Sequence, residues 1–164
     1  MASTAISKNF SPSKHRKIAV LPFQNNGQSG TDSQIADKLS LRLMERGFTI
    51  VERSQLERVF EEVKLNYTGA LSQAELKKIG KVLSVDMIIM GTLQYAYAPS
   101  QTTLVGNYAS STEGYLFLQS ETARFIDIET GEVLINSFCC DKDIGENGKI
   151  NEIASSIELT LQNR

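Results

Sequence analysis

The sequence predicts an α/β fold in which a mixed sheet of about five strands packs against about four helices. Three short apolar runs, around Ile18, Ile50 and Ile88, are typical of strands buried on both faces. Segments with helical spacing of apolar residues separate these runs, so right-handed crossovers would make the three strands mutually parallel. After residue 91 the pattern changes to alternation, which indicates C-terminal strands that add antiparallel to the same sheet.

The first strand is predicted over 17–23, and a helix is predicted to begin near Thr31 or Asp32. Gly47 follows this helix as a typical stop, and 48–51 form the second strand. One face of the helix is apolar and consists of Ile35, Ala36, Leu39 and Leu43.

Two capping boxes predict the next two helices, because a serine and a glutamate three residues later can satisfy free backbone N–H groups. Ser54 with Glu57 starts one helix, and Ser72 with Glu75 starts the other. A third buried strand is predicted over 85–91. The expected core faces of the two helices are Leu56, Val59, Phe60 and Val63, and then Leu76, Ile79, Gly80 and Leu83.

The segment after the third strand is predicted to be less regular. Leu93, Tyr95 and Tyr97 alternate with Gln94 and Ala96, which is typical of a half-exposed strand. The residues that follow, 99–113, are polar and contain no core periodicity, so a loop is expected there.

The C-terminal part is predicted to form a hairpin and a helix. Extended segments over 114–128 and 133–138 are joined by a tight turn at 127–132, where Gly131 supplies a positive φ. The last segment carries one apolar helical face, made of Ile150, Ile153, Ala154, Ile157 and Leu161.

The 164 residues are enough for one domain with a full hydrophobic core. Residues 1–16 are rich in small polar residues and are predicted to be a flexible N-terminal tether, whereas 17–164 are predicted to form a single α/β domain. No apolar stretch approaches the roughly 18 residues of a transmembrane helix. The N-terminus also lacks the apolar segment that is typical of a secretory signal.

Composition and charge disfavour several functional classes. The formal net charge of −2 gives no general attraction to nucleic acid, so no nucleic-acid partner is expected. His15, the only histidine, falls in the expected tether, which disfavours histidine-based catalysis or metal binding. The adjacent Cys139 and Cys140 are expected to be one buried and one exposed thiol rather than a redox pair. No catalytic, cofactor-binding or metal-binding residue is predicted, and the protein is expected not to be an enzyme.

Four segments carry a family resemblance through their order and spacing. They are IAVLPF at 18–23, FTIVERSQL at 48–56, IGKVLSVDMIIMG at 79–91 and FIDIETGE at 125–132. Together they resemble the CsgG-like family of cell-envelope proteins, which includes LpoB-like activators of penicillin-binding proteins, over roughly 17–140. The resemblance implies a non-enzymatic outer-membrane lipoprotein that faces the periplasm, held to the membrane only through a lipid anchor not present in this chain.

The sequence departs from CsgG itself in the regions where two hairpins per subunit build a secretion pore. The first such region, roughly 95–118, is shorter here and carries no sustained apolar alternation. At the second, residues 139–149 lead directly to the final helix. These departures disfavour a pore-forming role.

The candidate partner-binding residues are the four tyrosines that flank the polar loop: Tyr95, Tyr97, Tyr108 and Tyr115. Tyrosine is enriched at protein interfaces, but it is also a good strand former on a sheet edge, so both interpretations stay open.

The leading hypothesis is a non-catalytic protein-binding or assembly module of the cell envelope, with an envelope protein of unknown identity as its partner. One alternative is a subunit of an oligomeric secretion or envelope assembly, in which the domain associates with itself. A second alternative, a nucleotide-binding enzyme, is disfavoured because the loop at 25–32 matches no phosphate-binding motif.

Overall fold

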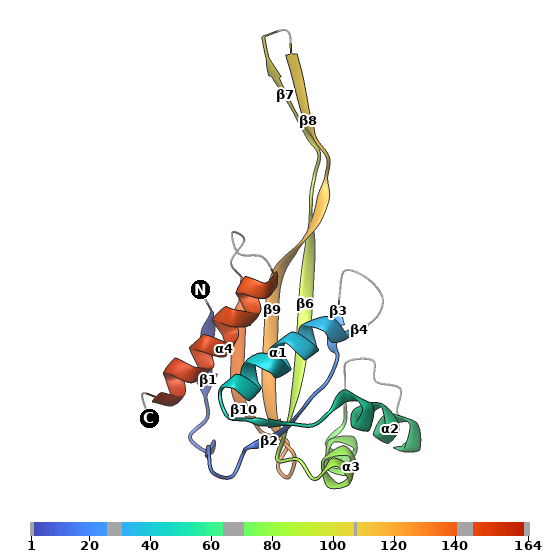
Figure 1. Cartoon of the computed structure of the whole chain (residues 1–164), viewed down its shortest axis with the longest axis vertical. Helices are drawn as coiled ribbons and strands as arrows, with labels where there is room; N and C mark the ends of the chain where they lie inside the picture. Colours follow the sequence, from blue (N-terminus) through green and yellow to red (C-terminus); the bar gives the residue numbers. More distant parts are fainter. Residues whose placement is uncertain (1, 26–30, 64–70, 107, 141–145, 163–164) are drawn as a thin grey trace.

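The computed structural model describes residues 2–25, 31–63, 71–106, 108–140 and 146–162. A sheet covered by helices forms the body, and a long two-stranded ribbon projects from it (Figure 1). The strands of the main sheet are β1 (Ser3–Ile6), β2 (Lys17–Val20), β3 (Phe23–Asn25), β4 (Thr31–Asp32), β5 (Thr49–Ile50), β6 (Met87–Ala98), β9 (Tyr115–Asp127) and β10 (Val133–Cys139).

The sheet has mixed topology, with the order β1–β10–β9–β6–β2–β5 and with β3 and β4 attached beside β6. β2 is parallel to both β5 and β6, so Ile18 pairs with Ile50 on one side and with Met87 on the other. β9 is antiparallel to β6, and β10 is antiparallel to β9. The predicted α/β class is confirmed, and β2, β5 and β6 are mutually parallel as expected. The pattern differs in detail, because β3 also pairs parallel with β6 and antiparallel with β4. The expected number of about five is too low, because β1, β3 and β4 are too short to show a periodic pattern.

The helices within the described residues are α1 (Ser33–Glu45), α2 (Arg53–Val63), α3 (Gln73–Leu83) and α4 (Glu146–Gln162). Asp32 caps α1, and Gly47 follows its end with a φ of 85°. The capping box at Ser72 is also present. The one predicted at Ser54 is wrong, because α2 already begins at Arg53 and Ser54 lies inside its first turn.

Two hydrophobic cores lie on opposite faces of the sheet. In β2, Ile18 and Val20 point into the core formed with α1 and α4. Ala19 and Leu21, which directly follows the strand, point into the core formed with α2 and α3. This double burial explains why the strand is a continuous apolar run rather than an alternating one. The expected core face of α4 is confirmed for its described side chains, while the side chains of Val63 in α2 and Leu161 in α4 lie outside the described part.

The prediction of a flexible tether over 1–16 is wrong for residues 2–16. β1 pairs antiparallel with β10 and extends the sheet, and the backbone N–H of Ala2 donates to Glu152 on α4 (2.7 Å). Phe10 is buried in the core next to α1. A four-residue strand with small side chains gives no recognisable periodicity, because its stability comes from the partner strand and not from its own sequence.

The prediction of a polar loop over 99–113 is also wrong for most of this segment. β7 (Gln101–Val105) and β8 (Tyr108–Thr112) pair antiparallel and continue the hairpin that β6 and β9 begin. Their described side chains are all exposed, so no alternation between buried and exposed positions marks them as strands.

Candidate functional site

The hairpin that leaves the body, here called the arm, comprises residues 95–118 (Figure 1). Inside the body, β6 is flanked by β9 on one side and by β2 and β3 on the other, but the last residue of β6 that pairs with β3 is Leu93. The pairing of β9 with β10 likewise stops at Glu121. Among the described strands, none pairs with the outer edges of the arm, so from Ala96 onward these edges are open to pairing with another strand.

Large apolar side chains are exposed on the arm. The candidate residues Tyr97, Tyr108 and Tyr115 are 63%, 83% and 57% exposed, whereas Tyr95 is half-buried and packs against the core of the body. Leu104 and Leu116 are also exposed, although neither was among the candidates. The signal that could have identified Leu116 is its position beside Tyr115 in the segment 114–128, which was already predicted to be extended.

The tyrosines do not form one continuous surface. Tyr97 pairs with Leu116, so these two side chains share one face of the ribbon. Tyr115 lies on the opposite face, where its ring contacts Phe117 with 6.1 Å between centroids. Tyr108 lies near the far end of the arm, where it pairs with Val105. The arm therefore carries apolar groups on both faces and near its tip.

Gly114 allows the ring of Tyr97 to lie against the ribbon. A Cβ atom at Gly114 would collide with the hydroxyl oxygen and the ring of Tyr97. Only glycine therefore permits this position of the ring without a shift of the backbone or the tyrosine.

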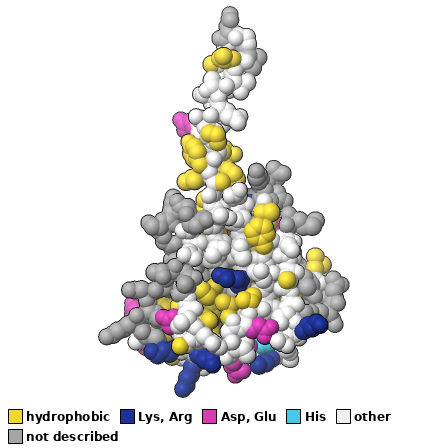
Figure 2. Space-filling view, turned by 180° about the vertical axis from the view of Figure 1, so that it is seen from behind, with side chains coloured by type: hydrophobic (Ala, Val, Ile, Leu, Met, Phe, Trp, Pro, Cys, Tyr) yellow, Lys and Arg dark blue, Asp and Glu magenta, His cyan; other side chains and the backbone are white. Residues whose placement is uncertain are grey.

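The arm is almost free of charge. Between residues 92 and 123 the sequence contains no lysine or arginine and only two carboxylates, of which Glu113 alone lies in the arm. Figure 2 shows apolar side chains, in yellow, gathered along the lower part of the arm, while the lysine and arginine side chains, in dark blue, lie on the body. Natural edge strands usually carry charged residues that discourage pairing with other chains, and this arm has almost none.

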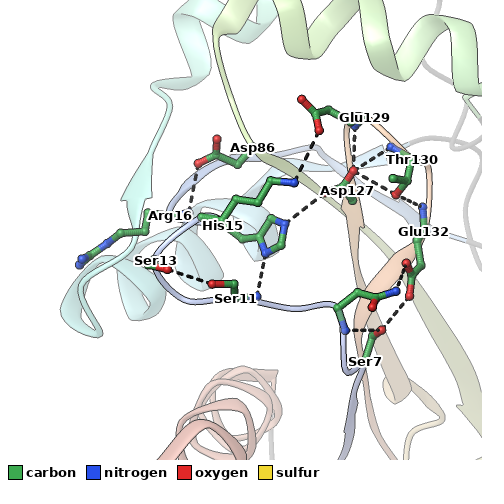
Figure 3. A network of polar contacts seen from close by, with 12 residues as sticks. Ser7, Ser11, Ser13, His15, Arg16, Asp86, Asp127, Glu129, Thr130 and Glu132 are labelled. Carbon is green, nitrogen blue, oxygen red and sulfur yellow. Dashed lines mark hydrogen bonds and ion pairs between the residues drawn. The ribbon is translucent and has the colours of Figure 1, made fainter.

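A second site, which is polar, lies at the end of the body opposite the arm, where the N-terminal segment meets the turn after β9 (Figure 3). His15 is 2% exposed, and its ring stacks on Phe10. The backbone N–H of Ser11 donates to Nδ1 of His15 (3.0 Å), so the other ring nitrogen, Nε2, carries the proton and donates to Asp127 (3.1 Å). Both ring nitrogens are occupied and buried, which suits a structural role rather than a general base.

Asp127 connects this histidine to the turn. Its other carboxylate oxygen accepts hydrogen bonds from the backbone N–H groups of Glu129 and Thr130 and from the Thr130 hydroxyl. Burial opposes ionisation, but the hydrogen bonds from Thr130 and Glu129 outweigh it and lower the pKa of Asp127. Gly131 completes the turn with a φ of 75°, as predicted.

Glu132 holds the N-terminal segment at Ser7 and Asn9, a few residues before His15. Its carboxylate accepts from the side chains of Asn9 (2.8 Å) and Ser7 (2.7 Å), and these two bonds lower the pKa of Glu132. The position of the N-terminal segment thus depends on carboxylates that lie more than 100 residues away in the sequence, which is why sequence patterns did not reveal it.

Comparison with protein families identifies the chain. A family model described as "Curli production assembly/transport component CsgG" matches residues 2–142, which is most of the sequence. The chain belongs to the CsgG family. The match begins at residue 2, in agreement with the observation that the N-terminal segment is part of the fold.

Several solved structures have folds similar to that of this CsgG-family protein. The LpoB C-terminal domain from Salmonella enterica has a TM-score of 0.54 at 11% identity, covering 82% of this chain and 87% of that one. A PelC dodecamer from Paraburkholderia phytofirmans has a TM-score of 0.53 at 14% identity, covering 100% and 99%. At these identities the likeness shows the fold alone. No curated protein sequence matches the chain.

The described part of this CsgG-family protein contains two free thiols. Cys139 is buried and Cys140 is exposed, so the prediction of one thiol in each environment is confirmed. In the described part of the chain, no three histidine, cysteine, aspartate or glutamate side chains are grouped so that they could hold a metal ion. None of the described helices is long and apolar enough to cross a membrane. Of the loop at 25–32, considered above for phosphate binding, residues 26–30 lie outside the described residues.

Proposed function

We propose that this CsgG-family domain is a non-catalytic binding and assembly module of the cell envelope, and that the arm is its partner-binding surface. The observation that carries the proposal is the exposure of Tyr97, Tyr108 and Tyr115 on an almost uncharged ribbon with two open edges. A free two-stranded hairpin is only marginally stable in water. A partner that covers the arm would bury its aromatic side chains and pair its free backbone groups.

The envelope location is part of the same proposal and rests on the family. The matching family is described as a curli assembly and transport component, and the similar LpoB and PelC folds suit a protein at the periplasmic face of the outer membrane. The occupied His15 ring supports the absence of catalysis, because a buried and fully bonded imidazole has no nitrogen free to accept a substrate proton.

A second candidate is a subunit of an oligomeric assembly, in which the partner is another copy of this chain. The open edges of the arm favour it, because an edge strand can pair with any strand that approaches it, including one from an identical chain. The similar PelC structure is a dodecamer, which makes self-association a reasonable alternative for this fold.

The test combines substitution on the arm with a matched control on the body. Tyr97→Ala together with Tyr108→Ala removes two exposed rings, and Leu159→Ala removes an exposed side chain from α4, which is 60% exposed. The folded proteins are used as bait in envelope extracts, and captured partner is measured per folded molecule. We expect the tyrosine variant to lose about tenfold or more in capture and the Leu159 variant to match the wild type.

Light scattering on the purified protein separates the two candidates. A mass that rises with concentration and falls back to the monomer in the tyrosine variant supports self-assembly. A monomer at every concentration, with partner capture that depends on the tyrosines, supports a different envelope protein. Capture that is equal for all variants excludes the arm as the binding surface.

A further inference from the structure

An apolar groove lies at the β5 end of the sheet, between α1 and α2. Its volume is about 380 Å³, and its lining includes Val20, Ile50 and Leu56 together with Leu41 and Met44 from α1. We propose that this groove, here called the β5 groove, binds an extended segment of a partner protein that adds to β5 as a further strand and carries a basic residue. The proposal goes beyond the role of the arm, because none of the residues lining the groove belongs to the arm.

The edge of β5 is open to a further strand. The backbone N–H groups of Thr49 and Val51 donate inward, to Arg16 and Ile18 respectively (2.9 Å each). Successive residues of a strand direct their backbone groups to opposite sides, so the N–H and C=O of Ile50 point outward. β5 is the last strand at this end of the sheet in the described part of the chain. An extended peptide is the ligand that uses such an edge, since main-chain hydrogen bonds provide the affinity.

The wall of the groove is more apolar than the fold requires. α1 already covers the sheet with Ile35 and Leu39, which are fully buried. Leu41 and Met44, three residues apart and therefore neighbours on the helix surface, are nevertheless 55% and 57% exposed beside the groove. Their side chains are suited to contact apolar residues that a bound strand would direct toward α1.

The charges at the rim indicate a basic residue in the bound segment. Arg53 is already paired, donating to Asp37 (3.2 Å) and to Glu57 (3.0 Å). Glu52 lies at the end of β5 with an exposed side chain, and within the described residues its carboxylate has no ion pair. Because the single charge of Arg53 is shared between two carboxylates and Glu52 has no ion pair, the named groups at the rim carry a net negative charge beside the open edge. A lysine or arginine at the matching position of the partner strand would pair with it.

The test uses a defined peptide and the full chain. The probe is a capped octapeptide in which valine alternates with threonine and one central threonine is replaced by lysine; a matched peptide has glutamate at that position. Binding is followed by NMR through the backbone amide of Ile50 and the side-chain methyl groups of Leu41 and Met44. We expect saturable shifts at these groups with the lysine peptide and weaker binding of the glutamate peptide.

Two variants at exposed positions make the test specific. Leu41→Asp is expected to weaken binding about tenfold, while Leu159→Asp on α4, also an exposed leucine, leaves it unchanged. Glu52→Lys is expected to reverse the preference, so that the glutamate peptide binds more tightly than the lysine peptide. This reversal cannot result from general damage to the fold.

Three results would overturn the proposal. The first is an absence of saturable shifts at the groove at millimolar peptide. The second is peptide-induced shifts confined to the arm, which would place strand binding there instead. The third is a change of the same groove signals with protein concentration alone, which would show that a second copy of the chain covers the groove. A failure of the arm proposal, seen as partner capture that does not depend on the tyrosines, would leave these peptide-binding measurements at the groove unaffected.

Discussion

β6 runs from the body into the arm, and the surroundings of its side chains change along its length. Met87, Ile88 and Ile89 are fully buried between helices on both faces, whereas Tyr97 near the other end is mostly exposed. β9 shows the same contrast, since Phe125 is fully buried and Tyr115 is exposed. The two strands stay paired with each other throughout, so the two regions differ in side-chain packing and in the pairing of their outer edges.

This difference shows that apolar residues are present in the two regions for different reasons. In the body, an apolar side chain contacts other parts of the same chain and contributes to folding. In the arm, Tyr97, Leu104 and Tyr108 have most of their surface in water, so folding does not explain their presence. Substitutions should therefore affect stability in the body and binding in the arm, and four measurements test that division.

The largest effect is expected from Phe125→Ala. Its ring is completely buried in the core next to α1, and loss of a buried phenylalanine costs about 3–5 kcal/mol of unfolding free energy through lost burial and the cavity left behind. Phe117→Ala, in the same strand but only half-buried on the arm, is expected to cost about 1 kcal/mol or less. Urea denaturation of both variants provides the measurement, and equal losses would contradict the division.

An intermediate effect is expected from Asp127→Ala. The substitution leaves buried His15 without its acceptor and removes three hydrogen bonds from the turn, and each buried unsatisfied group costs about 1–3 kcal/mol. Hydrogen exchange should speed up selectively at the amides of β1. The control is Glu129→Ala, which removes only an exposed ion pair with Lys14 and should change stability by less than about 1 kcal/mol. Unchanged exchange in β1 would show that His15 does not hold the N-terminal segment.

The same contrast explains what could be predicted from the sequence. The parallel strands around Ile18 and Ile88 were predictable, because burial on both faces requires a continuous apolar run. Ser72 and Gly131 were predictable because helix caps and tight turns depend on local geometry. Each of these features is determined by residues that are close together in the chain.

The features that the sequence did not reveal either depend on residues far away in the chain or have no buried contacts at all. β1 forms because β10 offers an edge more than 120 residues later in the sequence. His15 is buried because Asp127, 112 residues away, accepts a hydrogen bond from its ring. β7 and β8 have no buried face, so nothing in their sequence distinguishes a strand from a loop. The candidate tyrosines were found from composition, but composition could not show that Tyr95 packs against the core while the other three are exposed.

A smaller effect is expected from acidification. The pKa values of Asp127 and Glu132 are lowered in the folded protein, from ordinary values of 3.8 and 4.5, so both groups stabilise the fold when ionised. That contribution is complete above the ordinary values and is lost as the pH falls through the lowered ones. The unfolding free energy should therefore fall below about pH 4.5, and less steeply in Asp127→Asn than in the wild type. If the unfolding free energy falls with equal slope in the two proteins, ionisation of Asp127 does not contribute to stability.

The smallest effect on stability is expected from removal of most of the arm. Ala98 and Tyr115 are directly paired, so residues 99–114 can be replaced by an Asn-Gly turn, which matches the twist of a two-residue hairpin. The described side chains of β7 and β8 are all exposed, and their loss should change the unfolding free energy by less than about 1 kcal/mol.

If the arm is the binding surface, the same variant should lose partner capture almost completely while it keeps the melting temperature of the wild type. A loss of several kcal/mol would instead mean that the arm supports the body, and its exposed tyrosines would then need a structural explanation. Retained capture by the stable, shortened protein would move the partner site to the body, where the β5 groove, unaffected by this deletion, is the next surface to test.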